Sequence, residues 1–492
     1  MGAAKRFLAF DIGASSGRAI SGEWDGRRLA CEDIYRFPND PVQVHGCLHW
    51  DILRLFHEVR QGLLKYTGLH GNTVDAIGLD TWGVDFGLFD ATGYLLGNPL
   101  HHRDSGFAGV AEKLKALVGG YELYSQTGVV IEQVCTATQL YALARAGSSH
   151  LGAAKGLLMV PSILNYFLTG QFVDEFSSIS NTGLVAYRDG TPLTGFLEKM
   201  GVDSGLVPNT VAPGGVLGEL LPALKHDTGL TSAPVIACAT HDSASAVISV
   251  PADDKTNWAF LSCGTWSVLG VETGEPVTSR ESYDAGLTTA ATADGKFMTR
   301  MNVTGLWIVQ EMRRLWRQAG DAMEFGHMVD VAECATQFTA VIDVADPMFI
   351  NPPDMLDAIL GYLKGTGQLL PNNRGEMLRV VFESMALNYR RQIETISRVT
   401  GSSVEVLHVV GGGARNRLLC QLTANALGIP VLAGPVEATA MGNMLIQIMA
   451  SGEAHSVDEG RMLLRPSFDV TEYAPQDTNT WDEAYASYLN TI

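Results

Sequence analysis

The chain contains 492 residues, of which 46% are hydrophobic and 18% charged, and its formal net charge is −19. A chain of this length exceeds what one hydrophobic core normally supports, so we expect two globular domains. The acidic charge argues against nucleic acid as a partner, because phosphate backbones are bound by basic surfaces, whereas a single nucleotide can still be held by backbone amides.

Membrane insertion and disulfide bonding are also disfavoured. No apolar run reaches the roughly 20 residues that span a bilayer, and the N-terminus shows no signal peptide, because a polar turn follows within its first residues. The seven cysteines are scattered and form no C-x-x-C pair or metal cluster. We therefore expect a cytoplasmic protein with reduced thiols and no membrane partner.

The N-terminal segment predicts three antiparallel strands. The first two are expected at 7–11 and 18–24. A two-residue turn at Asp25-Gly26 is expected to lead into the third strand, which ends near residue 35.

A helix and two buried strands are expected next. The helix lies near 51–66, and its apolar face is predicted to contain Leu53, Phe56, Val59, Leu63 and Leu64. The strands follow at 76–80 and 84–89. Three meandering strands followed by alternating helices and strands are the plan of an RNase H-like α/β domain.

This plan is expected to occur twice. A buried-strand pattern at 234–239 runs into a helix of small residues, and a polar break follows near residue 250. We therefore expect an N-terminal domain at 1–250, a C-terminal domain at 251–470 and a helical tail at 471–492.

In the second domain, a strand at 404–410 runs into Gly411-Gly412-Gly413, and a helix follows from Asn416. Glycines let a flat ring approach the backbone, and a helix N-terminus can face phosphate. The segment is not a Walker A loop, which requires Gly-Lys-Ser/Thr. A plain strand-to-helix turn is the alternative. Further helices are expected at 304–317 and 375–398.

One glycine-turn hairpin occurs twice, at 8–20 and at 259–270. Turns built from Gly, Ser and Thr expose backbone N–H groups that can hold phosphate oxygens. Asp11 precedes the first turn and has the chemistry to organise magnesium, while Thr265 offers a hydroxyl in the second. An ordinary hairpin explains either turn alone, but the pair predicts a nucleotide held between duplicated domains.

The first turn also matches G-x-S-x-G at 13–17, the nucleophile elbow of serine hydrolases. That elbow needs a helix directly after the turn. A strand-like segment follows here instead, so the pattern disfavours a hydrolase.

His241-Asp242-Ser243 ends a buried strand and begins a helix. A carboxylate at a helix N-terminus is stabilised as the anion, which suits a proton acceptor, but a structural N-cap is an equally good explanation. A structural role, either helix capping or pairing, is likewise an alternative explanation for Asp80, Asp85 and Asp104. His101-His102 lacks the spacing of a metal site and indicates surface or hydrogen-bonded histidines.

Taken together, these motifs closely resemble the FGGY family of carbohydrate kinases, within the actin-like ATPase superfamily. The resemblance runs from residue 6 to about residue 450 and is greatest for the members that phosphorylate L-rhamnulose. The stretches that carry it are 11–18, 78–86, 240–243, 262–266, 305–307, 411–413 and 433–443.

The resemblance implies two RNase H-like domains with an interdomain cleft, a small sugar substrate, and ATP with Mg²⁺. It implies that Asp242 is the general base for the sugar hydroxyl and that Asp11 organises the metal. The implied sugar contacts are Gly83, His241, Ser243 and Asn302. The implied ATP contacts are Ala14, Ser15, Ser16, Gly17, Arg18, Thr265, Gln310 and Gly412.

The predicted activity is therefore the ATP-dependent conversion of L-rhamnulose to L-rhamnulose 1-phosphate. Within the family, L-fuculose or a ketopentose is the alternative substrate, because only a few hydroxyl contacts read the stereochemistry. A non-enzymatic member of the superfamily, such as a filament former or a chaperone-type switch, would lack a carboxylate like Asp242 or carry a further domain. The oligomeric state is left open.

Overall fold

The computed structural model describes residues 4–253 and 255–492. Contacts group the chain into two units, neither of which is continuous in sequence. Unit 1 comprises Met1–Pro251, Glu272–Thr299 and Ala438–Ser467, and unit 2 comprises Ala252–Val271, Arg300–Glu437 and Phe468–Ile492. The division into sequence domains stays a prediction, because a unit defined by contacts need not follow the sequence.

The main sheet of unit 1 has six strands in the order β11-β12-β6-β1-β2-β3. β1 (Lys5–Ile12) pairs antiparallel with β2 (Ser16–Trp24) and parallel with β6 (Ala76–Thr81). The predicted N-terminal strands and the buried strand at 76–80 are therefore confirmed. The remaining strands are β3 (Leu29–Pro38), β11 (Gly215–Glu219) and β12 (Pro234–Ala237).

The predicted two-residue turn between β2 and β3 is wrong. β2 ends at Trp24 and β3 begins at Leu29, and these two residues pair with each other, so the connecting loop is longer. The Asp25 carboxylate accepts hydrogen bonds from the backbone N–H groups of Arg27 (2.8 Å) and Arg28 (2.7 Å). This side-chain turn closes a wider loop than an Asp-Gly pair would.

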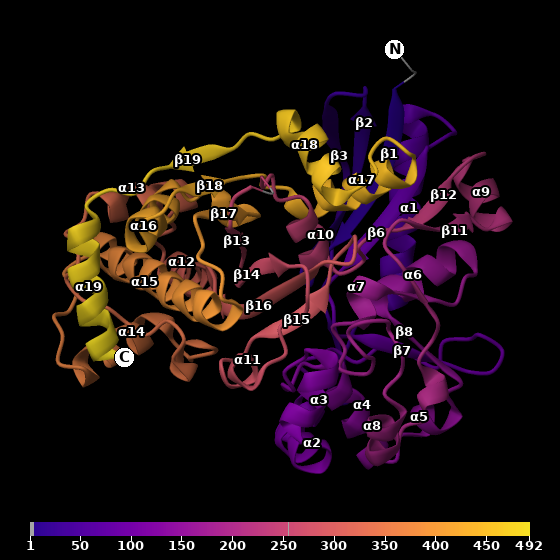
Figure 1. Ribbon diagram of the computed structural model, residues 1–492, viewed down its shortest axis with the longest axis horizontal. Coiled ribbons are helices and arrows are strands. Elements are labelled where there is room, and N and C mark those ends of the chain that lie inside the picture. The colour runs from indigo at the N-terminus through magenta and orange to yellow at the C-terminus, as the bar shows by residue number, and fades with distance from the viewer. Residues whose placement is uncertain (1–3, 254) are drawn as a thin grey trace. The chain divides into compact units, whose positions relative to one another are not determined.

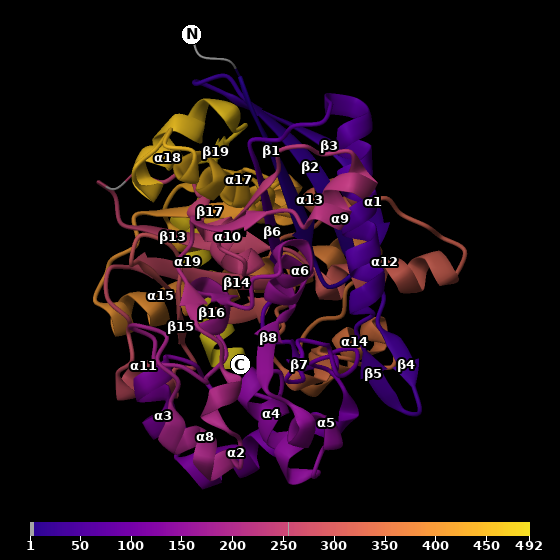
Figure 2. The same ribbon diagram turned by 90° about the vertical axis from the view of Figure 1, so that its right-hand side faces the viewer.

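One face of the sheet is covered by α1 (Ile52–His70), which packs on β2 and β3 and alongside α6 (Val160–Thr169) and α9 (Pro222–Thr228) (Figure 2). The predicted helix at 51–66 is thus confirmed. Leu8, Phe10 and Ile12 of β1 enter the same core, since alternate residues of a strand share a face.

The predicted apolar face of α1 is only partly right. Leu53 and Leu64 are 61% and 41% exposed, whereas Glu58 and Gly62 lie on the buried face. Glu58 accepts a hydrogen bond from the Tyr35 hydroxyl, and Gly62 lies directly against β1. The buried face therefore includes two residues that a hydrophobic pattern does not reveal.

The other face of the sheet is covered by α10 (Asp242–Ile248) and α17 (Ala438–Ala450) (Figure 1). A Cβ at Gly442 would lie only 1.8 Å from the Ser245 carbonyl oxygen, so the backbones of α17 and α10 touch. α18 (Val457–Leu464) packs against α17. A helix close to the C-terminal end of the chain thus completes the unit that begins at its N-terminus.

A smaller second core in unit 1 surrounds β7 (Phe86–Phe89) and β8 (Gly156–Met159). The predicted strand at 84–89 begins two residues late, because Val84 has a left-handed backbone φ of 77°. The helices here are α2 (Val110–Val118), α3 (Gly120–Thr127), α4 (Thr136–Arg145), α5 (Ser149–Ala153) and α8 (Thr194–Met200). Short elements nearby are β4 (Val42–Val44), β5 (Cys47–His49), β9 (Asp174–Glu175), α7 (Phe176–Ile179), β10 (Thr210–Val211) and α11 (Arg280–Asp284).

A second main sheet has seven strands in the order β15-β16-β14-β13-β17-β18-β19, and its central strands belong to unit 2. β13 (Trp258–Cys263) is antiparallel to β14 (Trp266–Thr273) and parallel to β17 (Val406–Val410). This pairing repeats that of β1, β2 and β6, so the sequence repeat is also a structural repeat. The other strands are β15 (Thr288–Ala291), β16 (Phe297–Thr304), β18 (Val431–Ala433) and β19 (Thr471–Tyr473).

The helices of unit 2 confirm the predictions at 304–317, at 375–398 and after Asn416. They are α12 (Trp307–Gln318), α13 (Phe325–Glu333), α14 (Met355–Gly365), α15 (Arg374–Thr400), α16 (Arg417–Leu427) and α19 (Thr478–Thr491). The segment expected as a helical tail begins with β19 and only then forms α19. Every helix in the described ranges is too short or too polar to cross a lipid bilayer.

Candidate functional site

Two aspartates lie side by side at the ends of neighbouring strands in unit 1. Asp11 of β1 is the register partner of Asp80 of β6. Asp11 Oδ2 accepts hydrogen bonds from Nε (3.1 Å) and Nη2 (2.7 Å) of Arg18 on β2. Both side chains of this ion pair are partly exposed, so one carboxylate and one guanidinium stand at the edge of the sheet.

Asp80 is fully buried beneath this pair. Its Oδ2 accepts a hydrogen bond from Asn443 Nδ2 at 2.6 Å, while its Oδ1 is buried without a hydrogen-bond partner. Burial holds the pKa of the Asp80 carboxyl well above its usual range, and the nearby charges of Asp11 and Asp242 raise it further. Structural pairing, one of the two roles expected for Asp80, is confirmed. Its partner Asn443, on α17, ends the motif at 433–443, but the pairing of the two residues was not predicted.

Asp242 is the first residue of α10, and the preceding His241 occupies the N-cap position without a side-chain capping bond. The structural explanation of Asp242 as an N-cap is therefore wrong. Its Oδ1 accepts a hydrogen bond from Ser243 Oγ at 3.2 Å and lies 3.7 Å from His241 Nε2. The side chain is about one-third exposed to solvent.

Three of the predicted sugar contacts, Gly83, His241 and Ser243, come together in unit 1. The ends of β6 and of the strand before α10 meet, because the Thr81 N–H donates to the Thr240 carbonyl at 2.9 Å. A Cβ at Gly83 would lie 3.1 Å from the His241 ring and 3.2 Å from Asn181 Nδ2. The absence of a side chain at Gly83 thus leaves room beside two polar groups.

A buried carboxylate fixes the turn that carries Gly83. Asp85 Oδ2 accepts hydrogen bonds from Trp50 Nε1 (2.6 Å), Trp82 Nε1 (2.8 Å) and His102 Nδ1 (2.7 Å). Its Oδ1 accepts one from Gln139 Nε2 at 3.0 Å. Four donors, three of them 17 to 54 positions away in the sequence, therefore converge on one side chain.

The remaining candidates of this region have structural roles. His101 is buried and stacks on Trp50 with ring centroids 4.2 Å apart, and burial lowers its pKa to about 4. Both neighbouring histidines are therefore satisfied rather than exposed. Asp104 caps a short 3₁₀ turn through the Gly106 N–H at 2.8 Å.

The predicted phosphate turn of unit 1 connects β1 and β2. Ala14, Ser15 and Ser16 are exposed. Asn39 holds the turn, since its Nδ2 donates to the Gly13 carbonyl at 2.8 Å and its N–H to the Ser15 carbonyl at 3.1 Å. The turn is followed by a strand, which rules out the nucleophile elbow.

Gly17, a predicted ATP contact, is buried in this hairpin. A Cβ there would lie 2.2 Å from the Phe37 ring. Packing alone therefore explains the glycine at this position.

The predicted contacts Thr265 and Gln310 belong to unit 2. The Gly264 and Thr265 carbonyls accept hydrogen bonds from the backbone N–H groups of Leu306 (2.9 Å) and Trp307 (3.0 Å). These bonds dock the β13–β14 turn onto the N-terminus of α12, which carries Gln310 one turn further on. Thr265 is exposed and Gln310 is half-buried.

The three glycines after β17 differ in their surroundings. A Cβ at Gly413 would lie 2.2 Å from Cys263 Sγ, and one at Gly411 would lie 3.2 Å from the Cys263 carbonyl. Gly412 is exposed, with open space where a Cβ would be. Because β13 and β17 are parallel neighbours, Thr265 and Gly412 lie at the same edge of the sheet.

Asn302, the fourth predicted sugar contact, is exposed on β16 and belongs to unit 2. Its Oδ1 lies 3.5 Å from Arg300 Nη1. The predicted site residues thus fall into two groups, one in each unit.

Magnesium fits the carboxylates of unit 1. The described residues contain no set of three or more His, Cys, Asp and Glu side chains arranged to hold a metal by themselves. Mg²⁺ in phosphoryl-transfer sites is instead bound by one or two carboxylates, phosphate oxygens and water. Asp11, Asp80 and Asp242 carry three carboxyl groups near one guanidinium, and Asp80 Oδ1 is unpartnered. The donor set is therefore of the kind that holds this cation together with a phosphate.

Solved structures with the same fold include a gluconate kinase and a xylulose kinase. The gluconate kinase from Lactobacillus acidophilus superposes with a TM-score of 0.83 at 16% identity, over 99% of this chain and 97% of that one. The xylulose kinase from Rhodospirillum rubrum gives 0.81 at 18% identity, over 99% and 98%. At these identities the likeness establishes the fold.

Sequence comparison is more specific. A rhamnulokinase from Bacteroides thetaiotaomicron is 39% identical over 99% of both chains, and one from Lactiplantibacillus plantarum is 33% identical over 98% of this chain and 97% of its own. The model of the N-terminal domain of the FGGY family of carbohydrate kinases matches residues 6–249, and that of its C-terminal domain matches residues 259–451. With both domains matched in order along nearly the whole chain, this protein belongs to the FGGY family of carbohydrate kinases.

Proposed function

We propose that this kinase converts L-rhamnulose and ATP to L-rhamnulose 1-phosphate and ADP. The observation that carries the substrate assignment is the 39% identity to a rhamnulokinase across 99% of both chains. Other FGGY sugars, such as L-fuculose or a ketopentose, remain the alternative because a few hydroxyl contacts decide among them.

We further propose that Asp242 is the general base. The sugar hydroxyl oxygen attacks the γ-phosphorus, the bond to the β–γ bridging oxygen breaks, and the hydroxyl proton passes to the Asp242 carboxylate. The partial exposure of Asp242 and its place beside His241 and the Gly83 turn support this role. Gly83, His241, Ser243 and Asn302 would hold the sugar.

ATP would be held by backbone amides and small side chains. The exposed turn at 14–16, the Arg18 guanidinium, the Thr265 hydroxyl and the open backbone at Gly412 suit phosphate and nucleotide. Gln310 and Gly17 complete the predicted set. Asp11 would hold Mg²⁺ in part, and the cation would supply charge neutralisation for the phosphates.

The assignment is tested by coupled ADP release with MgATP and a panel of L-rhamnulose, L-fuculose, L-xylulose, L-ribulose and glycerol. We expect L-rhamnulose to give the highest kcat/KM. A higher value for another sugar would replace the substrate and leave the kinase chemistry intact.

Asp242→Asn tests the base. The amide keeps the size of the side chain but cannot take the proton, so kcat should fall by roughly two to four orders of magnitude. ATP affinity, measured by calorimetry, should change less than threefold. Near-normal turnover of the variant contradicts the role.

A further inference from the structure

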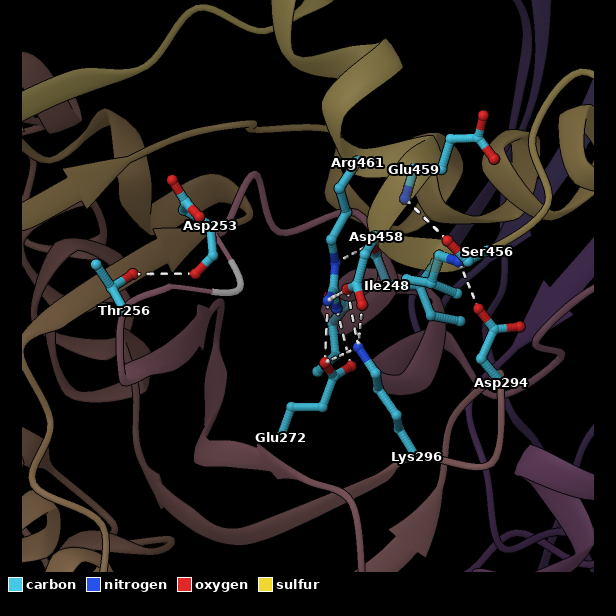
Figure 3. A network of polar contacts seen from close by, with 12 residues as sticks. Ile248, Asp253, Thr256, Glu272, Asp294, Lys296, Ser456, Asp458, Glu459 and Arg461 are labelled. Carbon is cyan, nitrogen blue, oxygen red and sulfur yellow. Dashed lines mark hydrogen bonds and ion pairs between the residues drawn. The ribbon is translucent and has the colours of Figure 1, made fainter.

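Arg461 of α18 is a buried guanidinium with every N–H group engaged. Its side chain is only 2% exposed. Nη1 and Nη2 form a two-pronged ion pair with the Glu272 carboxylate, with both distances 2.9 Å, and Nη1 also contacts Asp458 at 3.1 Å (Figure 3). An arginine has five N–H donors, and these three bonds leave two of them for other partners.

The two remaining donors bind the end of α10. Arg461 Nε donates to the Ile248 carbonyl at 3.1 Å, and Nη2 donates to the Val247 carbonyl at 3.0 Å. The last carbonyls of a helix lack ordinary partners within the helix. The Val247 carbonyl here also accepts the Val250 N–H at 3.1 Å, and Arg461 adds a side-chain donor to it and to the neighbouring Ile248 carbonyl. The other end of this short helix is Asp242.

α10 is also fixed along its length. Gly442 of α17 touches the Ser245 carbonyl so closely that no side chain fits between the two helices. With α17 against its middle and Arg461 at its end, α10 has little freedom to slide or rotate. A shift at its last turn would therefore be transmitted to its first residue.

A second cation belongs to the same cluster but does not touch the helix. Lys296 Nζ binds both Asp458 oxygens, at 2.8 and 2.7 Å, and lies 3.3 Å from Glu272 (Figure 3). Arg461 and Lys296 thus share both carboxylate partners, and only Arg461 reaches the carbonyls of α10. Substituting Lys296 therefore weakens the ion-pair cluster without removing a bond to α10, whereas substituting Arg461 does both.

We propose that Arg461 is a positioning residue that holds Asp242 in place by anchoring the opposite end of α10, an inference that rests on the proposed role of Asp242 as the base. Misplacing a catalytic group by about 1 Å can reduce a rate about 100-fold. Loosening the anchor should therefore lower kcat while the KM for ATP changes little. The KM for the sugar should rise, because Ser243, a proposed sugar contact, lies on the same turn of α10 as Asp242.

The experiment compares R461K with K296M in the full-length enzyme. R461K keeps the positive charge but loses the planar fork that serves Glu272 and the helix together. We expect kcat to fall about 10- to 100-fold in R461K and less than twofold in K296M, although both lower the melting temperature. E272Q leaves Arg461 in place but weakens its two-pronged ion pair with residue 272, so it should lower kcat by a smaller factor than R461K does. If R461K does not fold, E272Q compared with K296M tests the inference.

A double-mutant cycle distinguishes positioning from general damage. If Arg461 acts through Asp242, then R461K should have no further effect on the residual kcat of D242N, whereas K296M should have the same small effect in both backgrounds. Equal kcat losses for R461K and K296M, or additivity of R461K with D242N, would overturn the inference. High activity of D242N itself would instead remove the proposed base, so the two failures are distinguishable.

Discussion

The convergence of four donors on Asp85 makes this single carboxylate decisive for the Gly83 turn. Removing it with Asp85→Ala takes this acceptor from two buried indole N–H groups and the His102 imidazole, at about 1–3 kcal/mol for each, whereas the Gln139 amide keeps its bonds to two backbone carbonyls. We expect a loss of several kcal/mol in unfolding free energy and, in any folded enzyme, a raised KM for the sugar with an unchanged KM for ATP. Urea unfolding and steady-state kinetics measure both.

Glu58→Ala is the matched control for Asp85→Ala. Glu58 is also a buried carboxylate with a hydrogen-bonded partner, but it lies on α1, away from the Gly83 turn. It should lower stability without changing the sugar KM. If the Asp85 variant also leaves the sugar KM unchanged, the turn does not depend on this carboxylate.

Substitutions at Gly83 and Gly412 should affect the KM values of different substrates. In Gly83→Ala the new methyl group crowds His241 and Asn181, so the KM for the sugar should rise at least several-fold while that for ATP stays constant. Gly412→Ala meets no protein atom within 4 Å and should fold normally, but its methyl group occupies the proposed nucleotide face and should raise the KM for ATP. A swapped or common effect contradicts the proposed division.

At the scale of elements, the contact between α10 and α17 leaves no room for change. Gly442→Ala would place a methyl carbon against a backbone carbonyl, which cannot rotate away, and should cost about 1–3 kcal/mol or more. Gly460→Ala is the comparison, because its methyl group would meet the flexible end of Leu445 at 2.7 Å. Denaturant midpoints should therefore fall further for the first variant than for the second.

Elements with local signals could be predicted from the sequence, and long-range partners could not. The glycine hairpins, the strand before Gly411 and the helix starting at Asp242 follow from short patterns of turn residues and apolar runs. Asn443 pairs with Asp80 across 363 positions, and Trp50 reaches Asp85 across 35, so no local pattern reveals them. These unforeseen residues are the ones that hold the predicted site residues in place.

At the scale of the whole molecule, one buried acid should shape the pH dependence of stability. Burial raises the pKa of Asp174 to about 7, whereas an unfolded aspartate titrates near 3.8. The folded state therefore keeps a proton that the unfolded state releases, and stability falls as the pH rises from about 4 to 7. Asp174→Asn should remove this term, so the variant should gain stability relative to the natural protein across that range in urea melts.

The amide oxygen introduced by Asp174→Asn would still accept the hydrogen bond that the Met159 N–H donates at 3.2 Å, so a loss of folding is not expected from that contact. A stability difference that does not vary between about pH 4 and 7 would contradict the shifted pKa.

Because residues 438–467 belong to unit 1, the folding of that unit depends on a segment that is synthesised late. Gly78 of β6 packs directly against Asn443 and Gln447, so the part of this sheet face that α17 covers stays open until α17 has left the ribosome, although α10 is made much earlier. Domains usually fold from the N-terminus as they emerge. Here the first strands to be made must wait for one of the last helices, and the growing chain carries an exposed part of this sheet face through most of its translation.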